Sequence, residues 1–172
     1  MMDLGVTYGG GIADMKLSAW ADAEHAACPD TRRSVSGAAL MLGEGVINWF
    51  SRAQRVAAAA TSESEYVALA EIVNELRFLL LVKAFMMPSI DHEINIYEDI
   101  EGATKMANNR LSSPRTRHID IKHHIVRDGV EGKIVRVEYV KSGEQHADAL
   151  TKALDIKTFE RHRKYLLNVR GS

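Results

Sequence analysis

The stretch Leu17–Ala23 reads LSAWADA and alternates Leu and Ala residues with Ser18, Trp20 and Asp22. A period of two is typical of a β-strand. An aspartate is unusual inside a strand, and an isolated buried carboxylate is strongly destabilising unless a partner or a metal ion compensates its charge. Two interpretations follow. Asp22 is either part of a buried polar site or lies at the solvated end of its strand.

Outward from this strand, the chain alternates further strands with helices. A glycine-containing loop, Gly43-Glu44-Gly45, predicts a hairpin. A long helix is predicted over Thr61–Phe85, with Pro88 shortly after its end. The other predicted strands are Ser34–Leu42, Val46–Ser51, Glu93–Glu98 and Lys133–Val140, and the other predicted helices are Gly102–Asn108, His118–Val130, Glu144–Leu154 and Ile156–Leu167. This order predicts an α/β fold in which helices flank a five-stranded mixed sheet.

Composition limits the class of protein. A chain of 172 residues that is 46% hydrophobic can bury one core, so a single domain is expected. The 22 basic and 23 acidic residues give a net charge of −1, whereas a free-standing nucleic-acid binder usually has a basic excess. Any contact with nucleic acid is therefore local or helped by a neighbouring domain. The single cysteine, Cys28, excludes an internal disulfide framework. We find no signal peptide and no long apolar run, so we expect no membrane insertion and an intracellular, cytoplasmic location.

Three further acids lie where separate predicted elements begin or end. Asp99 follows a predicted strand, which is where α/β folds tend to place ligand sites, and Asp148 lies in a late predicted helix. Glu65 lies in the first turn of the long helix, where it could equally pair with Ser62 in a capping box, and Glu63 could be the functional acid instead. Each acid alone has an ordinary structural role. Together with the strand aspartate, they are expected to converge.

Converging carboxylates repel one another, which raises some of their pKa values unless a cation is present. Mg²⁺ and Mn²⁺ are hard ions that bind carboxylate oxygens. Two such ions about 4 Å apart can activate a water molecule and stabilise the leaving oxygen in phosphodiester hydrolysis. The acids therefore indicate a metal-dependent nuclease that uses two ions and forms no covalent enzyme intermediate.

Six segments follow one another in a characteristic order. They are ACPDTRRSVSG (Ala27–Gly37), INWFSRAQ (Ile47–Gln54), TSESEYVALAE (Thr61–Glu71), IYED (Ile96–Asp99), RTRHIDIKHH (Arg115–His124) and EQHADALTKAL (Glu144–Leu154). Together they resemble the RNase H domain of copia-type LTR retrotransposon Pol polyproteins, which lies downstream of the reverse transcriptase.

The resemblance covers about residues 15–155 and implies a ribonuclease H-like domain there. Residues 1–14 would be a lead-in or connection segment, and residues 156–172 a C-terminal helix and tail. The implied activity is cleavage of the RNA strand in RNA–DNA hybrids during reverse transcription. The implied partners are the hybrid and the adjacent reverse transcriptase domain of the same polyprotein, within the retrotransposon particle.

The resemblance also assigns roles to the four acids. It implies that Asp22, Glu65, Asp99 and Asp148 are both the catalytic residues and the ligands of two Mg²⁺ or Mn²⁺ ions. Asp22 and Asp99 would bridge or hold the ions, and Glu65 would orient ligands on the RNA side. Asp148 would complete the shell of the second ion.

The chain departs from the family pattern beside two of these acids. The family usually reads Ala-Asp-Trp-Ala-Gly after the first acid, where this chain has AEHAA (Ala23–Ala27). It usually reads Asn-Gln after the third acid, where this chain has Ile100 and Glu101. The Lys141–Gly143 loop also has no histidine placed for proton transfer. No expected ligand is lost, but the alternative of a catalytically decayed or domesticated binding module stays open. An integrase is disfavoured because integrases place their glutamate on a late helix.

Basic side chains form two candidate nucleic-acid contacts. Arg115, Arg117 and Lys122 belong to the densest run of positive charge, and Arg32 and Arg33 lie in a predicted loop. Each group either contacts the phosphate backbone or forms a solvated surface.

The other notable side chains favour structural roles. The histidines of His118–His124 do not all share one helix face and have no accompanying cysteine pair, which argues against a zinc site. Trp20 and Trp49 are expected in the core, because so few aromatic residues leave little for a base-stacking surface.

Overall fold

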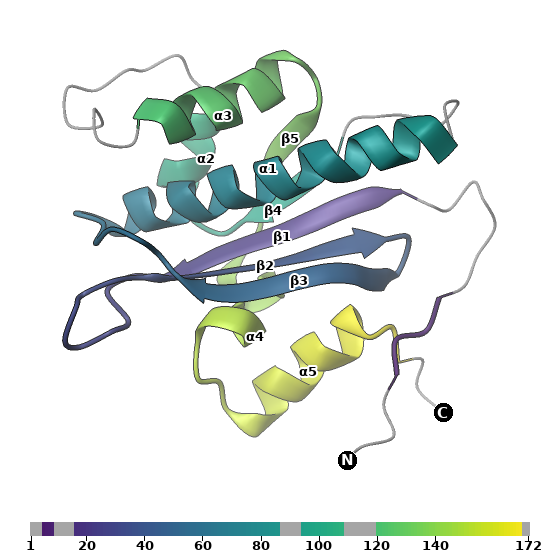
Figure 1. Cartoon of the computed structure of the whole chain (residues 1–172). Coiled ribbons are helices and arrows are strands. Elements are labelled where there is room, and N and C mark those ends of the chain that lie inside the picture. Colours follow the sequence, from purple (N-terminus) through teal and green to yellow (C-terminus); the bar gives the residue numbers. More distant parts are fainter. Residues whose placement is uncertain (1–4, 9–15, 87–93, 109–119, 170–172) are drawn as a thin grey trace.

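The computed structural model describes residues 5–8, 16–86, 94–108 and 120–169. One five-stranded sheet carries all the strands of this part of the chain, in the order β3-β2-β1-β4-β5 (Figure 1). The strands are β1 (Leu17–Glu24), β2 (Val35–Leu42), β3 (Gly45–Ala53), β4 (Ile94–Glu98) and β5 (Val135–Tyr139). The helices are α1 (Thr61–Met86), α2 (Glu101–Asn108), α3 (Asp120–Glu131), α4 (Asp148–Thr151) and α5 (Ile156–Leu166), with a 3₁₀ turn over Ser142–Glu144. The predicted α/β fold is confirmed.

The sheet is mixed, as predicted. β1 pairs antiparallel with β2, and β2 pairs antiparallel with β3. β1 also pairs parallel with β4, which pairs parallel with β5. The expected β2–β3 hairpin is present, and its turn places Gly43 at a φ of 60°, a left-handed conformation that glycine adopts without strain.

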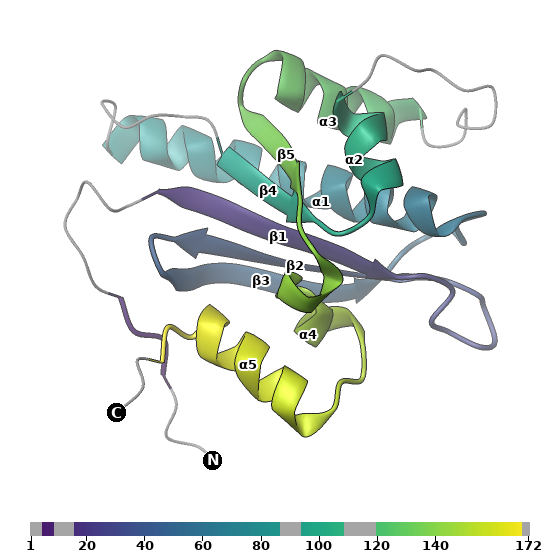
Figure 2. The same cartoon turned by 180° about the vertical axis from the view of Figure 1, so that it is seen from behind.

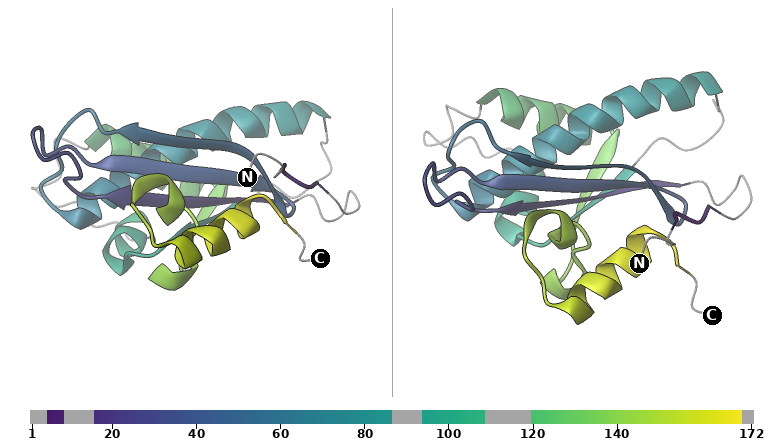
Figure 3. Two further views of the ribbon diagram at one scale, coloured as in Figure 1. Left: turned by 90° about the horizontal axis from the view of Figure 1, so that it is seen from below. Right: turned by 60° about the horizontal axis from the view of Figure 1, so that its bottom comes forward.

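Helices cover both faces of the sheet (Figures 2 and 3). α1, α2 and α3 lie on one face, and α4 and α5 lie on the other. Because side chains alternate along β1, Ala19 and Ala21 join the core beneath α1, while Trp20 packs on the opposite side. The largest apolar cluster lies between α1 and the sheet and includes Leu69, Ile72 and Leu76 of α1.

An aromatic cluster attaches α5 to the second face. The ring of Trp20 lies 4.4 Å from that of Tyr97 and 4.5 Å from that of His146. His146 stacks on Tyr165 of α5 with ring centroids 3.6 Å apart. Its Nδ1 lies 3.0 Å from Nδ1 of His162, which is also on α5. This cluster packs α5 against the face of the sheet that carries Trp20.

Two expectations from the sequence are wrong. Trp49 is 62% exposed, because it lies on the edge strand β3, where its ring lines an apolar cavity of about 240 Å³ with Val46, Phe159 and Leu166. The continuous helix predicted over Glu144–Leu154 is broken into a 3₁₀ turn and the short helix α4. Over the ranges given above, no helix combines the length and apolar character needed to cross a bilayer.

Candidate active site

The site begins where β1 and β4 separate. Their parallel pairing runs from Ser18 to Trp20 on β1 and is not continued further. Beyond this point the buried amide of Gln145 lies between the two strands, and its Nε2 donates to the carbonyl of Ala21 at 2.7 Å and to that of Tyr97 at 3.4 Å. Asp22 and Asp99 follow at the diverging ends of the strands, where parallel strands of an α/β sheet open a crevice.

The N-terminal part of α1 carries two acids, Glu63 and Glu65, in different surroundings. The Glu63 carboxylate accepts a hydrogen bond from the Ala59 backbone N–H at 2.8 Å. Glu65 is buried and 1% exposed. Carboxylate oxygens of Glu65, Glu98 and Asp99 lie within 4.8 Å of one another, and Glu63 belongs to no such group among the described residues.

The four predicted acids meet in two overlapping groups. Carboxylate oxygens of Asp22, Asp99 and Asp148 lie within 4.8 Å of one another, and so do those of Glu65, Glu98 and Asp99. Asp99 belongs to both groups. All four acids thus lie at one edge of the sheet. They come from β1, the start of α1, the end of β4 and the start of α4, and the sequence from Asp22 to Asp148 spans 127 positions.

Glu98 is a fifth acid that the sequence analysis did not single out. It lies in β4 on the same face as Ile94 and Ile96, and all three are 0% exposed. The signal was present in the sequence, because strand alternation puts the glutamate of INIYE at a buried position. One of its oxygens, Oε1, accepts a hydrogen bond from the Ile100 N–H at 3.2 Å.

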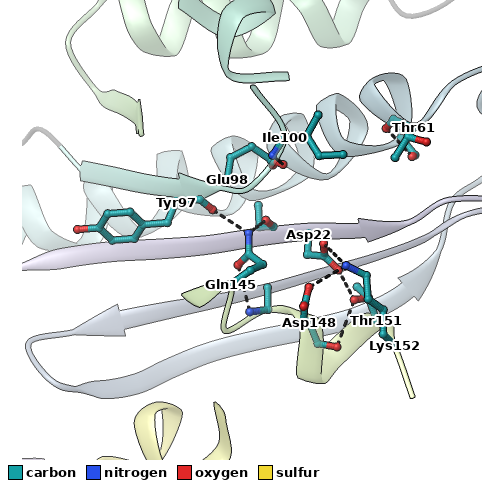
Figure 4. A network of polar contacts seen from close by, with 12 residues as sticks. Asp22, Thr61, Tyr97, Glu98, Ile100, Gln145, Asp148, Thr151 and Lys152 are labelled. Atoms are coloured by element: carbon teal, nitrogen blue, oxygen red, sulfur yellow. Dashed lines mark hydrogen bonds and ion pairs between the residues drawn. The ribbon is translucent and has the colours of Figure 1, made fainter. Parts of the chain in front are cut away.

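Lys152 is the second residue that the sequence analysis missed. Its Nζ lies 3.0 Å from Asp22 Oδ1 and 2.8 Å from Asp148 Oδ1 (Figure 4). The Thr151 hydroxyl donates to the other oxygen of Asp22. The four-residue spacing of Asp148 and Lys152 predicts their pairing on a helix. The contact with Asp22 depends on the fold.

A glycine allows α4 to approach the sheet closely enough for these contacts. A Cβ at Gly37 of β2 would lie 2.5 Å from Thr151 Cγ2 and 3.0 Å from Leu150 Cβ. Gly37 is paired with Asp22 across the β1–β2 ladder. The absence of a side chain at Gly37 thus sets the distance between α4 and Asp22.

Burial has the largest effect on the pKa values of three acids, Asp22, Glu65 and Glu98. Burial raises the pKa of Asp22, and Lys152 opposes the rise. Burial, followed by repulsion from Glu98, Asp22 and Asp99, raises the pKa of Glu65 to about 11. Burial also raises the pKa of Glu98 well above its usual range. Although burial alone would lower the pKa of Lys152, Asp22 and Asp148 raise it.

The donor set fits a hard divalent cation. Glu65 Oε2 and Glu98 Oε2 are buried and have no hydrogen-bond partner within the described residues. Such oxygens are costly unless a proton or a cation satisfies them. All the candidate ligands are carboxylate oxygens, which Mg²⁺ and Mn²⁺ prefer.

The two departures beside Asp99 do not disturb this arrangement. The Ile100 side chain packs against the main core, while its N–H bonds Glu98. Glu101 pairs with Lys105 at 2.7 Å, and its side chain is 66% exposed. The additional negative charge of Glu101 is therefore directed to solvent.

The structure describes three of the five residues that the sequence predicts to contact phosphate. Arg32 and Arg33 are exposed in the loop that follows β1. Because this loop follows the end of β1, it starts at the edge of the sheet that carries Asp22. Lys122 of α3 is half-buried, and burial lowers its pKa. Arg115 and Arg117 lie outside the described residues.

Comparison with known proteins identifies relatives of the whole region. No protein-family model matches the chain. It is 32% identical over 152 residues to the "Retrovirus-related Pol polyprotein from transposon TNT 1-94" of Nicotiana tabacum, over 87% of this chain and 11% of that protein. It is 31% identical over 146 residues to the corresponding polyprotein from transposon RE2 of Arabidopsis thaliana, over 85% of this chain and 10% of that protein. The chain therefore spans only about a tenth of the length of these relatives.

Solved structures identify the fold. The N-terminal RNase H domain of Rv2228c from Mycobacterium tuberculosis superposes with a TM-score of 0.57 at 13% identity, over 87% of this chain and 97% of that one. LC11-RNase H1, solved in complex with an RNA/DNA hybrid, gives 0.56 at 14% identity, over 79% of this chain and 94% of that one. The chain is thus a ribonuclease H-fold homologue of one segment of the retrovirus-related Pol polyproteins of transposons.

Proposed function

We propose that the chain is a divalent-metal-dependent ribonuclease H that cleaves the RNA strand of RNA–DNA hybrids in retrotransposon reverse transcription. The observation that carries the proposal is the meeting of five carboxylates at one edge of a ribonuclease H-type sheet. The Lys152 ammonium balances only part of the negative charge that these carboxylates carry when ionised, and hard divalent cations would balance the rest.

Each of the four predicted acids has a role in this proposal. Asp99 is the ligand common to both groups, Asp22 and Asp148 complete one group, and Glu65 completes the other and orients ligands on the RNA side. These acids would hold two Mg²⁺ or Mn²⁺ ions, which when bound would provide an activated water molecule and stabilise the leaving 3′-oxygen. The side chains hold and orient the reacting groups, and none of them forms a covalent bond with the RNA.

Substrate binding would combine shape recognition with a few phosphate contacts. Hybrids are recognised mainly by helix shape and by 2′-hydroxyl groups. The exposed Arg32 and Arg33 support backbone contact beside the acids, and Lys122, Arg115 and Arg117 are further candidates. With a net charge of −1, binding by this segment is expected to be weak and salt-sensitive, so the adjacent reverse transcriptase domain would supply part of the affinity. Tight hybrid binding at high ionic strength contradicts this part of the proposal.

A cleavage assay tests the activity. A hybrid with an end-labelled RNA strand is incubated with the chain in Mg²⁺ or Mn²⁺, alongside the Asp22→Asn variant, with EDTA and single-stranded RNA as controls. We expect metal-dependent cleavage of the hybridised RNA by the parent chain and a loss of at least about 100-fold in the variant. Equal background signals from both proteins would instead identify a decayed domain that only binds.

A further inference from the structure

The two halves of the acid cluster differ in how their charge is balanced. On the α4 side, the Lys152 ammonium contacts Asp22 and Asp148, at 3.0 and 2.8 Å, and Thr151 donates to Asp22. On the α1 side, the described residues place no ammonium or guanidinium within ion-pair distance of Glu65 or Glu98. One half therefore carries an internal cation, and the other half does not.

The α1 side of the cluster contains two buried carboxylate oxygens that lack a hydrogen-bond partner among the described residues. Glu65 is 1% exposed and Glu98 is 0% exposed, and Oε2 of each has no hydrogen-bond partner among the described residues. These carboxylates and that of Asp99 bring oxygens within 4.8 Å of one another. A single divalent ion could contact all three, and it would balance more of their negative charge than a single proton does.

A backbone hydrogen bond also orients the carboxylate of Glu98. Its Oε1 accepts from the Ile100 N–H at 3.2 Å, which orients the carboxylate and leaves Oε2 directed away from that bond. The side chain is 0% exposed and lies on the same face of β4 as the core residues Ile94 and Ile96. A carboxylate held in this way is preorganised as a ligand.

We propose that Glu98 is a fifth metal ligand and that Glu65, Glu98 and Asp99 form the tighter of two divalent-ion positions. The position between Asp22 and Asp148 is the weaker one, because an ion must displace Lys152 there. The inference rests on the proposed metal-dependent function. The family resemblance assigned metal-ligand roles to only four acids. The inference adds a ligand and an order of filling: the α1 side fills first, and the α4 side fills at higher metal concentration.

The test measures binding directly. Free Mn²⁺ is followed by electron paramagnetic resonance as it is titrated into the full chain and its variants, in the absence of nucleic acid. The parent chain is expected to show one tight and one weaker class of site. Glu98→Gln keeps the size of the side chain and an oxygen for the Ile100 N–H, and it should weaken the tight class by about tenfold or more.

Two companion variants separate the halves. Lys152→Met should strengthen the weaker class and leave the tight class unchanged. Glu101→Gln, at an exposed acid that pairs with Lys105 beside the site, should change neither class. Thermal unfolding in EDTA provides a readout of purely structural effects: Glu98→Gln should not lower the Tm, because it removes a buried group that lacks a partner for one oxygen.

The outcomes are distinguishable. Unchanged Mn²⁺ binding by Glu98→Gln, with hybrid cleavage intact in the parent, overturns the fifth-ligand inference and leaves the proposed function standing. A lower Tm of Glu98→Gln with unchanged binding assigns Glu98 a structural role and likewise overturns the inference. Absence of both Mn²⁺ binding and cleavage in the parent chain overturns the proposed function itself.

Discussion

The side-chain amide of Gln145 donates a 2.7 Å hydrogen bond to the carbonyl of Ala21, a residue 124 positions earlier in the chain. The bond lies where β1 and β4 stop pairing, one residue before Asp22. The Gln145 Oε1 in turn accepts from the N–H of Ala147, at the start of α4. One buried amide thus joins the strand that carries the first acid to the helix that carries the last.

Replacing Gln145 with Leu should destabilise the protein and separate these acids. The change preserves volume but leaves the Ala21 carbonyl and the Ala147 N–H without this partner, which should lower the free energy of unfolding by about 1–3 kcal/mol. Urea denaturation measures the change, with Glu144→Gln at the exposed neighbouring position as the control. Parental stability of the Leu variant would show that the amide bridge is unimportant.

Gly37→Ala should lower activity by displacing α4. The new Cβ would lie 2.5 Å from Thr151 Cγ2, so the helix must move, and with it the contacts of Thr151 and Lys152 to Asp22. Misplacing a catalytic group by about 1 Å can cost about 100-fold in rate. The measurement is hybrid cleavage at saturating Mn²⁺. Gly143→Ala is the matched control, since nothing lies within 4 Å of its added Cβ. A parental rate in Gly37→Ala contradicts the packing argument.

The metal-free protein should lose stability as pH rises, in part because of Glu65. Burial first, and then repulsion from Glu98, Asp22 and Asp99, raises its folded-state pKa from 4.5 to about 11. Between these values the folded state binds a proton that the unfolded state has released, so the free energy of unfolding falls with increasing pH. In EDTA, Glu65→Gln should show a shallower fall than the parent. The same slope in both proteins would exclude Glu65 as a source of the pH dependence.

His146 should act in the opposite direction at low pH. Burial, with smaller contributions from His162 and Arg161, lowers its folded-state pKa from 6.5 to about 4. Between these values the unfolded state binds the extra proton, so stability is lost as pH falls. His146→Phe retains a ring for stacking on Tyr165 and should reduce the loss of stability between these pH values. Thermal unfolding from pH 7 to pH 4 tests this, and a steeper acid loss in the variant would contradict it.

The sequence predicted the elements whose pattern is local. The alternation of LSAWADA, the glycines of the hairpin and the long apolar helix all carry their signal within one segment, and β1, the β2–β3 hairpin and α1 lie where expected. α1 begins at the predicted Thr61 and extends one residue beyond the predicted Phe85.

The features that the sequence did not predict depend on distant contacts. The helix predicted over Glu144–Leu154 is broken because Gln145 bonds β1 and β4 and not its own helix. The Lys152–Asp22 ion pair joins residues 130 positions apart, so no local spacing signals it. Trp49 is exposed because β3 is an edge strand, which only the strand order reveals. Glu98, by contrast, could have been found from alternation alone.

The central claim is that Asp22, Glu65, Asp99 and Asp148 form one cation-binding site. Anomalous diffraction from crystals of the chain soaked in Mn²⁺ tests it most directly, because it locates the ions without relying on turnover. We predict anomalous peaks at coordination distance, about 2.0–2.2 Å, from Asp99 carboxylate oxygens, with the other three acids shared between the bound ions. Well-ordered crystals with no anomalous peak among these four side chains would contradict the account.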